Sequence, residues 1–311
     1  MNDTLTNTKK RTRIFRWLGT ILSFVLLIFL FQRQGWDEIT DAFQQVSGFS
    51  FGIGVVLIFV SRFAVVGRWH SLLRSVERVS LYQTARITFA GLFASNFLPT
   101  TVGGDVVRFA GAVQQGISGV TVAASLVVDR LIGMLGMIFA LPFGARPLFQ
   151  WLSVGRAPQA GIVTGVSIPW IDRLWEKGAV LLKKLVEAVK VWSKHPQSLL
   201  ISLGCTFIHM LCTFGSMKLL FNDMGEQLPF SMVAGLWSFV YFVTLLPVSI
   251  NGFGVQEISI AFIFSEVGGV SLQHGLTVSV IFRTLMMIGS LPGVFFVPGI
   301  IAGKGNKGGE S

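Results

Sequence analysis

The chain has 311 residues, of which 52% are hydrophobic and only 13% charged, and its mean hydropathy is +0.68. A soluble domain carries about 25% charged residues, so the composition excludes an ordinary soluble protein and predicts an all-α polytopic integral membrane protein. The net charge of +10 comes from basic residues that cluster beside apolar runs. That pattern is typical of cytoplasmic flanks facing anionic lipid and argues against nucleic acid as a partner.

The first apolar run, residues 17–31, follows a short basic segment, residues 9–13. Gln32, Arg33 and Gln34 stand where a signal peptide would need small residues for cleavage, so we predict a retained span after a cytoplasmic basic tail (1–13). A second run, 48–66, returns the chain to the cytoplasm, where four arginines follow: Arg68, Arg74, Arg78 and Arg86. The prediction is a multi-pass protein of the plasma (inner) membrane with a cytoplasmic N-terminus.

A stretch that is too short to cross the bilayer, residues 87–97, then runs into proline, paired glycines and an aspartate. Backbone groups opened by such a break need partners inside protein or around a wet cavity. We therefore predict that residues 84–114 form a re-entrant helix pair. Residues 120–142 are a clear span, whereas 144–169 are a poor one.

The connector 170–195 is predicted to be an amphipathic helix lying in the membrane interface, with a solvated loop helix as the alternative. Further apolar segments follow at 199–221, 232–246, 255–264 and 276–301, with a second broken motif after 246. The fold class is thus six to eight spans plus two re-entrant pairs in a transmembrane domain (14–301), and the tail 302–311 is expected to be disordered.

The two broken motifs match each other and indicate an internal repeat. Leu98, Pro99 and Gly104 align with Leu246, Pro247 and Gly252, and further matches follow in the same order. Paired, proline- and glycine-interrupted apolar segments in two halves point to a transporter site near the membrane midplane. We predict an inverted repeat, with halves of about 50–142 and 198–301, provided that 144–169 recrosses the membrane.

These motifs carry a resemblance to a known family. The residues are Asn96, Pro99, Gly103, Gly104, Asp105 and Arg108, then Asp129 and Arg130, then Leu246, Pro247, Ser249, Asn251, Gly252, Gly254 and Glu257. They resemble the lysylphosphatidylglycerol synthase transmembrane family, the flippase-like membrane domain of the multiple-peptide-resistance-factor proteins, over about residues 15–300. The resemblance implies lipid-accessible cavities between two re-entrant pairs. The aminoacyl-transferase domain of full-length members is not expected, because the chain stops at Ser311.

Charged residues inside apolar segments are expensive unless they pair or face water, so they mark a candidate site. We predict that a lipid headgroup site contains six of them: Arg108, Asp105, Arg130, Asp129, Arg283 and Glu257. Arginine binds phosphate through its planar fork, whereas the alternative role is structural ion pairing. Glu257 is read as an arginine partner or a protonation site. Arg62 is interpreted as a snorkelling residue.

The predicted hairpin tips combine glycines for tight backbone with capping side chains. Their residues are Asn96, Pro99, Thr101, Gly103, Gly104, Pro247, Ser249, Asn251, Gly252 and Gly254. Cys205, His209 and Cys212 share one helix face but cannot surround an ion by themselves, so no metal and no cofactor is predicted.

The predicted function is a flippase-like transporter that moves an anionic phospholipid or a polyprenyl-linked lipid between leaflets, and not an enzyme. The alternatives are a secondary transporter of a small solute, a membrane-embedded transferase, and a membrane partner of a lipid-modifying enzyme. Membrane lipids are the expected partners, and a homo-oligomer or a lipid-enzyme complex is left open.

Overall fold

A computed structural model describes residues 44, 46–96, 103–153, 192–245 and 254–301, and within these ranges all regular structure is helical. The prediction of an all-α membrane protein is confirmed. Four helices are long and apolar enough to cross a bilayer. They are α3 (Gly48–Arg74), α6 (Gly119–Ala140), α9 (Pro196–Asp223) and the segment Leu272–Phe295, which contains α12.

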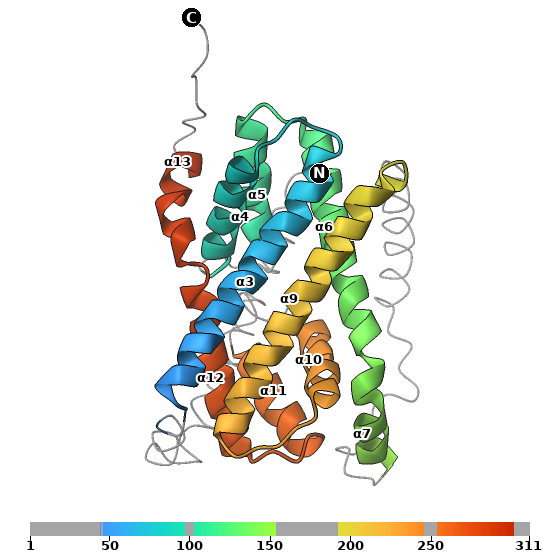
Figure 1. Ribbon diagram of the computed structural model, residues 1–311, viewed down its shortest axis with the longest axis vertical. Coiled ribbons are helices and arrows are strands. Elements are labelled where there is room, and N and C mark those ends of the chain that lie inside the picture. The colour runs from blue at the N-terminus through green and yellow to red at the C-terminus, as the bar shows by residue number, and fades with distance from the viewer. Residues whose placement is uncertain (1–43, 45, 97–102, 154–191, 246–253, 302–311) are drawn as a thin grey trace, which may run out of the picture.

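The long helices α3 and α9 lie side by side along the molecule (Figure 1). They are tied at one end, where Asp223 accepts hydrogen bonds from Ser47 N (2.9 Å) and from Ser50 Oγ (2.9 Å). Ser47 also caps α3, because its hydroxyl accepts a hydrogen bond from Ser50 N.

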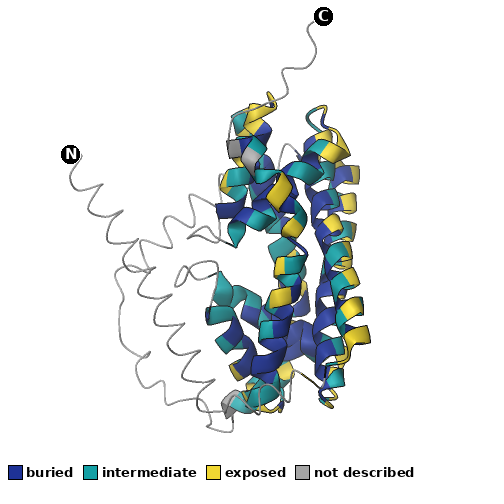
Figure 2. Ribbon diagram, turned by 90° about the vertical axis from the view of Figure 1, so that its left-hand side faces the viewer, coloured by how far each residue is buried: buried dark blue, intermediate teal, exposed yellow. Residues whose placement is uncertain are grey.

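The outer faces of these two helices are apolar. On α9 the exposed large side chains fall on one stripe at helical spacing, and they include Leu200, Leu203, Phe207 and Leu211. Figure 2 shows exposed residues along the outer edge and buried residues on the side that faces the shorter helices. Helices that cross a bilayer need an apolar outer face, because this face contacts the hydrocarbon chains of the lipids.

The shorter helices form two groups on the inner side of α3 and α9. Helices α4 (Leu81–Ser95) and α5 (Gly103–Gln114) lie in one half of the molecule, and α10 (Phe230–Thr244) and α11 (Val255–Glu266) lie in the other (Figure 1). Within each group the two helices pack against each other. Helix α7 (Pro142–Ser153) packs against α10 and represents the described part of the poorly apolar region after α6.

The last apolar run differs from the prediction of one span over 276–301. Helix α12 (Leu272–Ile288) ends, a 3-10 turn covers Leu291–Phe295, and a short helix α13 (Val297–Ile301) follows. Pro292 lacks a backbone N–H, and Gly293 lets this segment touch the carbonyl oxygen of Phe89 on α4, where a Cβ would lie only 2.0 Å away. The break therefore allows the C-terminal segment to pack closely on α4.

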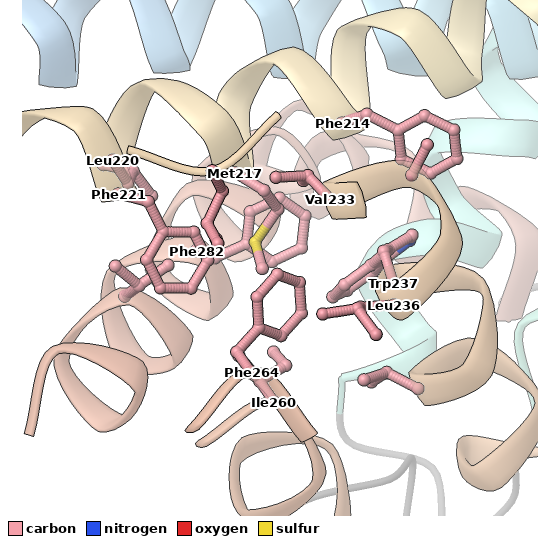
Figure 3. Close-up of a cluster of buried hydrophobic side chains, with 14 of the residues drawn as sticks. Phe214, Met217, Leu220, Phe221, Val233, Leu236, Trp237, Ile260, Phe264 and Phe282 are labelled. Atoms are coloured by element: carbon pink, nitrogen blue, oxygen red, sulfur yellow. The ribbon is translucent and has the colours of Figure 1, made fainter. Parts of the chain in front are cut away.

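Three apolar clusters fill the described interior, and the two largest contain most of its buried hydrophobic residues. The larger one joins α9, α10, α11 and α12 in the half shown in Figure 3, where Phe221 stacks on Phe264 with ring centroids 4.9 Å apart. The smaller one contains Trp69, Ile87 and Leu126, from α3, α4 and α6. Of the predicted amphipathic connector the structure describes residues 192–195, and Trp192 is buried with its indole N–H donating to Leu72 O (3.0 Å).

Candidate functional site

A network of charged side chains lies between the two largest apolar clusters. Along α6, cluster residues Leu126 and Met137 flank Asp129 and Arg130, so the charges fall midway along a candidate span. The Asp129 carboxylate is 1% exposed and is held by two arginines. A carboxylate at this depth is stable only with such partners.

Arg68 on α3 makes the first of these contacts. Its Nε donates to Asp129 Oδ1 (2.7 Å) and its Nη2 to Oδ2 (3.3 Å), which is the two-pronged geometry that arginine forms with carboxylates. The sequence interpretation placed Arg68 in a cytoplasmic flank, and that placement is wrong. The local sequence carried no clear signal for its burial, because His70, Ser71 and Arg74 follow it directly along the chain.

Arg108 on α5 makes the second contact, donating to Asp129 Oδ2 from both terminal nitrogens (3.1 Å each). Its guanidinium also lies over the Trp69 ring, 4.2 Å from the centroid, a favourable cation–π arrangement. Trp69 is fixed in turn by a hydrogen bond from its indole N–H to Ser125 Oγ (3.1 Å). Arg108 is thus held by the Asp129 carboxylate and by the Trp69 ring.

Close contact between α4 and α5 places Arg108 there. A Cβ at Gly104 would lie 2.6 Å from the carbonyl oxygen of Gly91, and a Cβ at Gly91 would lie 2.7 Å from Arg108 Cγ. Only glycine permits this approach of two backbones. Gly103 and Gly104, predicted to allow tight backbone at a hairpin tip, are the first two residues of α5, and the rest of that tip lies outside the described residues.

Asp105 extends the network to Arg130. Asp105 Oδ1 accepts a hydrogen bond from Arg108 Nη1 (3.0 Å), and its other oxygen accepts one from Arg130 Nε. Arg130 is the accessible member, with 35% of its side chain exposed against 8% for Arg108. Three arginines share two aspartates, which leaves this network with one net positive charge.

The second half of the molecule contains a separate ion pair. Arg283 Nε on α12 donates to Glu257 on α11, and Glu257 also accepts a hydrogen bond from Gly254 N (2.8 Å). Gly254 has φ +76°, the left-handed conformation that favours glycine, as the sequence predicted for a position at a break. The six predicted charges therefore form two separate groups: Asp105, Arg108, Asp129 and Arg130 in one, and Glu257 and Arg283 in the other.

A cavity of about 290 Å³ lies beside the network, and we call it the central cavity. Helices of both halves contribute to its wall. Its polar lining residues are Arg62, Arg130, His209, Thr213, Tyr241, Thr244 and Gln256.

Arg62 differs from its predicted snorkelling role. It lies midway along α3, is 8% exposed, and donates from Nη2 to Met286 O (3.2 Å) instead of reaching the interface. The helix on both sides of it is too long for the side chain to reach either end, so the charge stays at depth.

The family was established by comparison with known proteins. A family model described as the lysylphosphatidylglycerol synthase TM region matches residues 16–293. The chain belongs to the lysylphosphatidylglycerol synthase transmembrane family. This family is a membrane domain associated with lipid-related functions, which agrees with the resemblance carried by the broken motifs. No curated protein matches the chain.

The family's broken motifs are described only at their edges. Asn96 ends α4, and its side-chain amide donates to Ser290 Oγ (2.8 Å), so the first motif contacts the C-terminal segment. Six of the predicted tip residues lie outside the described residues: Pro99, Thr101, Pro247, Ser249, Asn251 and Gly252.

The pair in the second half can be tested by substituting Glu257. Glu257→Gln keeps an oxygen for Gly254 N but removes the charge that faces Arg283, so we expect the unfolding free energy to fall by about 1.5–3 kcal/mol. Glu257→Ala also removes the cap and is expected to cost about 1 kcal/mol more. Unfolding in mixed detergent micelles measures the loss of stability in both variants. Equal stability of Glu257→Gln and wild type would contradict this role of the pair.

Proposed function

We propose that this protein translocates an anionic lipid between leaflets of the plasma membrane, with an anionic phospholipid or a polyprenyl-phosphate lipid as the substrate. One observation carries the proposal: a charge network with net positive charge borders a polar cavity midway along apolar helices. A polar cavity at this depth provides a path for a charged headgroup, which hydrocarbon alone opposes. The family's association with lipids supports the same conclusion.

In this mechanism the headgroup passes through the central cavity while its acyl chains remain in the bilayer. Arg130 is the first arginine that the headgroup meets, because it is the most exposed member of the network and lines the cavity. The two short-helix groups act as re-entrant pairs of an inverted repeat, with a cytoplasmic N-terminus. No covalent bond forms or breaks, so the protein is a transporter and not an enzyme.

Ion-coupled transport of a small solute is the main alternative. It needs a carboxylate that takes up and releases the coupling ion. The three candidates, Asp105, Asp129 and Glu257, each already accept a hydrogen bond from an arginine. This arrangement favours a fixed charged framework, and it is the reason that lipid translocation is preferred here.

Lipid scrambling in proteoliposomes tests the proposal. Wild-type protein is expected to move labelled phosphatidylglycerol or a polyprenyl phosphate between leaflets. Arg130→Ala is expected to slow it by about tenfold, because a charge-assisted contact to phosphate is lost. Arg86→Ala is the matched control, since Arg86 lies on α4 against Tyr82 and Phe296, outside the network and the cavity.

Folding is verified in each preparation by the thermal exposure of Cys212, a buried free thiol. Absence of translocation of either lipid by folded wild-type protein would count against the proposal, and uptake of a water-soluble solute in the same vesicles would favour the alternative.

A further inference from the structure

We propose that the central cavity is a phosphate-binding site in which Arg62 is the principal cation. The bound phosphate belongs to a lipid headgroup, and only this choice of source rests on the proposed function. A free phosphate ester offers the same chemistry, so the two sources are separated experimentally below.

The Arg62 side chain is buried with most of its hydrogen-bonding capacity unused. A guanidinium has five N–H donors and carries its charge permanently. Arg62 is 8% exposed, and its Nη2 donates to a neutral carbonyl, Met286 O, and approaches the Met286 sulfur (3.3 Å). Its Nε is buried with no hydrogen-bond partner in the described part of the chain.

Arg62 also lacks a countercharge among the described residues. Each of the other buried arginines, Arg68 and Arg108, contacts a carboxylate. Within the described ranges Arg62 forms no salt bridge, and the lining of the central cavity contains no acidic residue. A buried charge is costly unless it is paired, so this site is complete only when an anion occupies it.

The cavity places further hydrogen-bond donors near Arg62. Arg130 brings a second guanidinium to the cavity wall, shared with Asp105, while Thr213 and Tyr241 bring hydroxyl groups. His209 is oriented by Ser61, whose Oγ lies 2.6 Å from its Nδ1. Two guanidinium groups with neighbouring hydroxyl and imidazole groups match an oxyanion that accepts several hydrogen bonds.

The volume of the cavity limits the size of the headgroup that it can hold. Its volume of about 290 Å³ is at the lower end of the range for small-molecule sites, about 300–1,000 Å³. A phosphate with a small substituent such as glycerol fits this space, whereas an oligosaccharide headgroup does not. The inferred ligand is therefore the phosphate of a small-headgroup lipid.

Binding is tested with purified protein in an uncharged maltoside detergent, which contributes no phosphate. The probes are dioctanoyl phosphatidylglycerol, glycerol 1-phosphate, and dioctanoylglycerol, which lacks phosphate. Tryptophan fluorescence provides the binding signal, because Trp237 lines the cavity. We expect the phospholipid to bind most tightly, glycerol 1-phosphate more weakly, and dioctanoylglycerol not measurably.

The decisive variant is Arg62→Gln, which keeps a side-chain N–H for Met286 O but removes the charge. Its affinity for the phospholipid is expected to fall about tenfold or more, because charge-assisted hydrogen bonds are lost. The affinity of Arg62→Lys for the phospholipid is expected to lie between those of wild type and Arg62→Gln. Lysine keeps the positive charge but lacks the planar, two-pronged guanidinium. Arg86→Gln, the matched control, is expected to bind like wild type.

A stability measurement distinguishes a binding role from a structural one. Without ligand, Arg62→Gln is expected to melt at the same temperature as wild type or above it, because the substitution removes a buried charge that meets no carboxylate in the described structure. The phospholipid should raise the melting temperature of wild type and leave that of the variant unchanged. A lower melting temperature for the unliganded variant, with unchanged affinity, would overturn the proposal.

The outcomes also separate this inference from the proposed function. Arg62-dependent phosphate binding by a protein that moves no lipid would support the site and count against translocation. Translocation and binding that are both unchanged in Arg62→Gln would overturn the site and leave translocation standing. Equal affinity for glycerol 1-phosphate and the phospholipid would support the phosphate site but contradict a lipid source.

Discussion

Replacing Asp129 with asparagine is expected to lower the unfolding free energy by about 3–5 kcal/mol. The side chain is 1% exposed and accepts four N–H···O contacts from Arg68 and Arg108, which are themselves buried. The amide removes the only carboxylate that Arg68 contacts in the described structure. Removing one partner of a buried ion pair is more damaging than removing both, because the remaining charge stays at depth.

Unfolding in mixed micelles, monitored by exposure of the Cys212 thiol, measures this loss. Asp105→Asn is the matched control. It is expected to lower the unfolding free energy by less, because Asp105 is 14% exposed and Arg108 keeps its contact with Asp129. The double variant Arg68→Gln, Asp129→Asn is expected to recover part of the stability, and the cycle isolates the coupling between the pair. Additive effects of the two single changes would contradict the inferred contact.

Replacing Gly104 with alanine is expected to lower stability by about 1–3 kcal/mol and also to impair lipid translocation. The added Cβ would lie 2.6 Å from the backbone oxygen of Gly91, and backbone cannot rotate aside as a flexible side chain does. Helices α4 and α5 must separate, and this movement withdraws Arg108 from Asp129. One methyl group thus acts on both the packing and the charge network.

Gly204→Ala is the matched control for this effect. Gly204 is also inside a helix, α9, but a Cβ there meets nothing within 4 Å. Because glycine inside a helix costs about 0.5–1 kcal/mol relative to alanine, this variant is expected to be as stable as wild type or more stable. Thermal melting compares the two directly. A Gly104→Ala protein as stable as Gly204→Ala would show that α4 and α5 are not closely packed.

The helices and the family were predictable from local sequence. Runs of apolar residues predicted α3, α6 and α9 to within a few residues, except that α3 continues to Arg74. The reason is that the length and composition of an apolar run are properties of contiguous residues. The broken motifs were recognisable for the same reason, and they led to the family that the comparison confirmed.

The partners of the charges were only partly predictable. Asp105 and Arg108 are three residues apart on one helix, and their pairing was proposed from that spacing. Arg68 and Asp129 are 61 residues apart, on helices whose relative placement no local pattern reveals, and Arg68 was misassigned to a flank. Arg62 was misread for a related reason: a lone arginine in an apolar run gives no sign of whether its head reaches the interface.

By itself, the sequence determined the membrane class, the family and most of the described helices, and it placed Asp129 and Glu257 at depth. All of these follow from the solvent preference and spacing of neighbouring residues. Only the tertiary structure decided which arginines share an aspartate, why Gly104 must be glycine, and that Arg62 lines a cavity with no acidic residue among the described residues. These depend on how close separate helices come, because ion pairing and close packing act over a few ångströms between residues that are far apart in the chain.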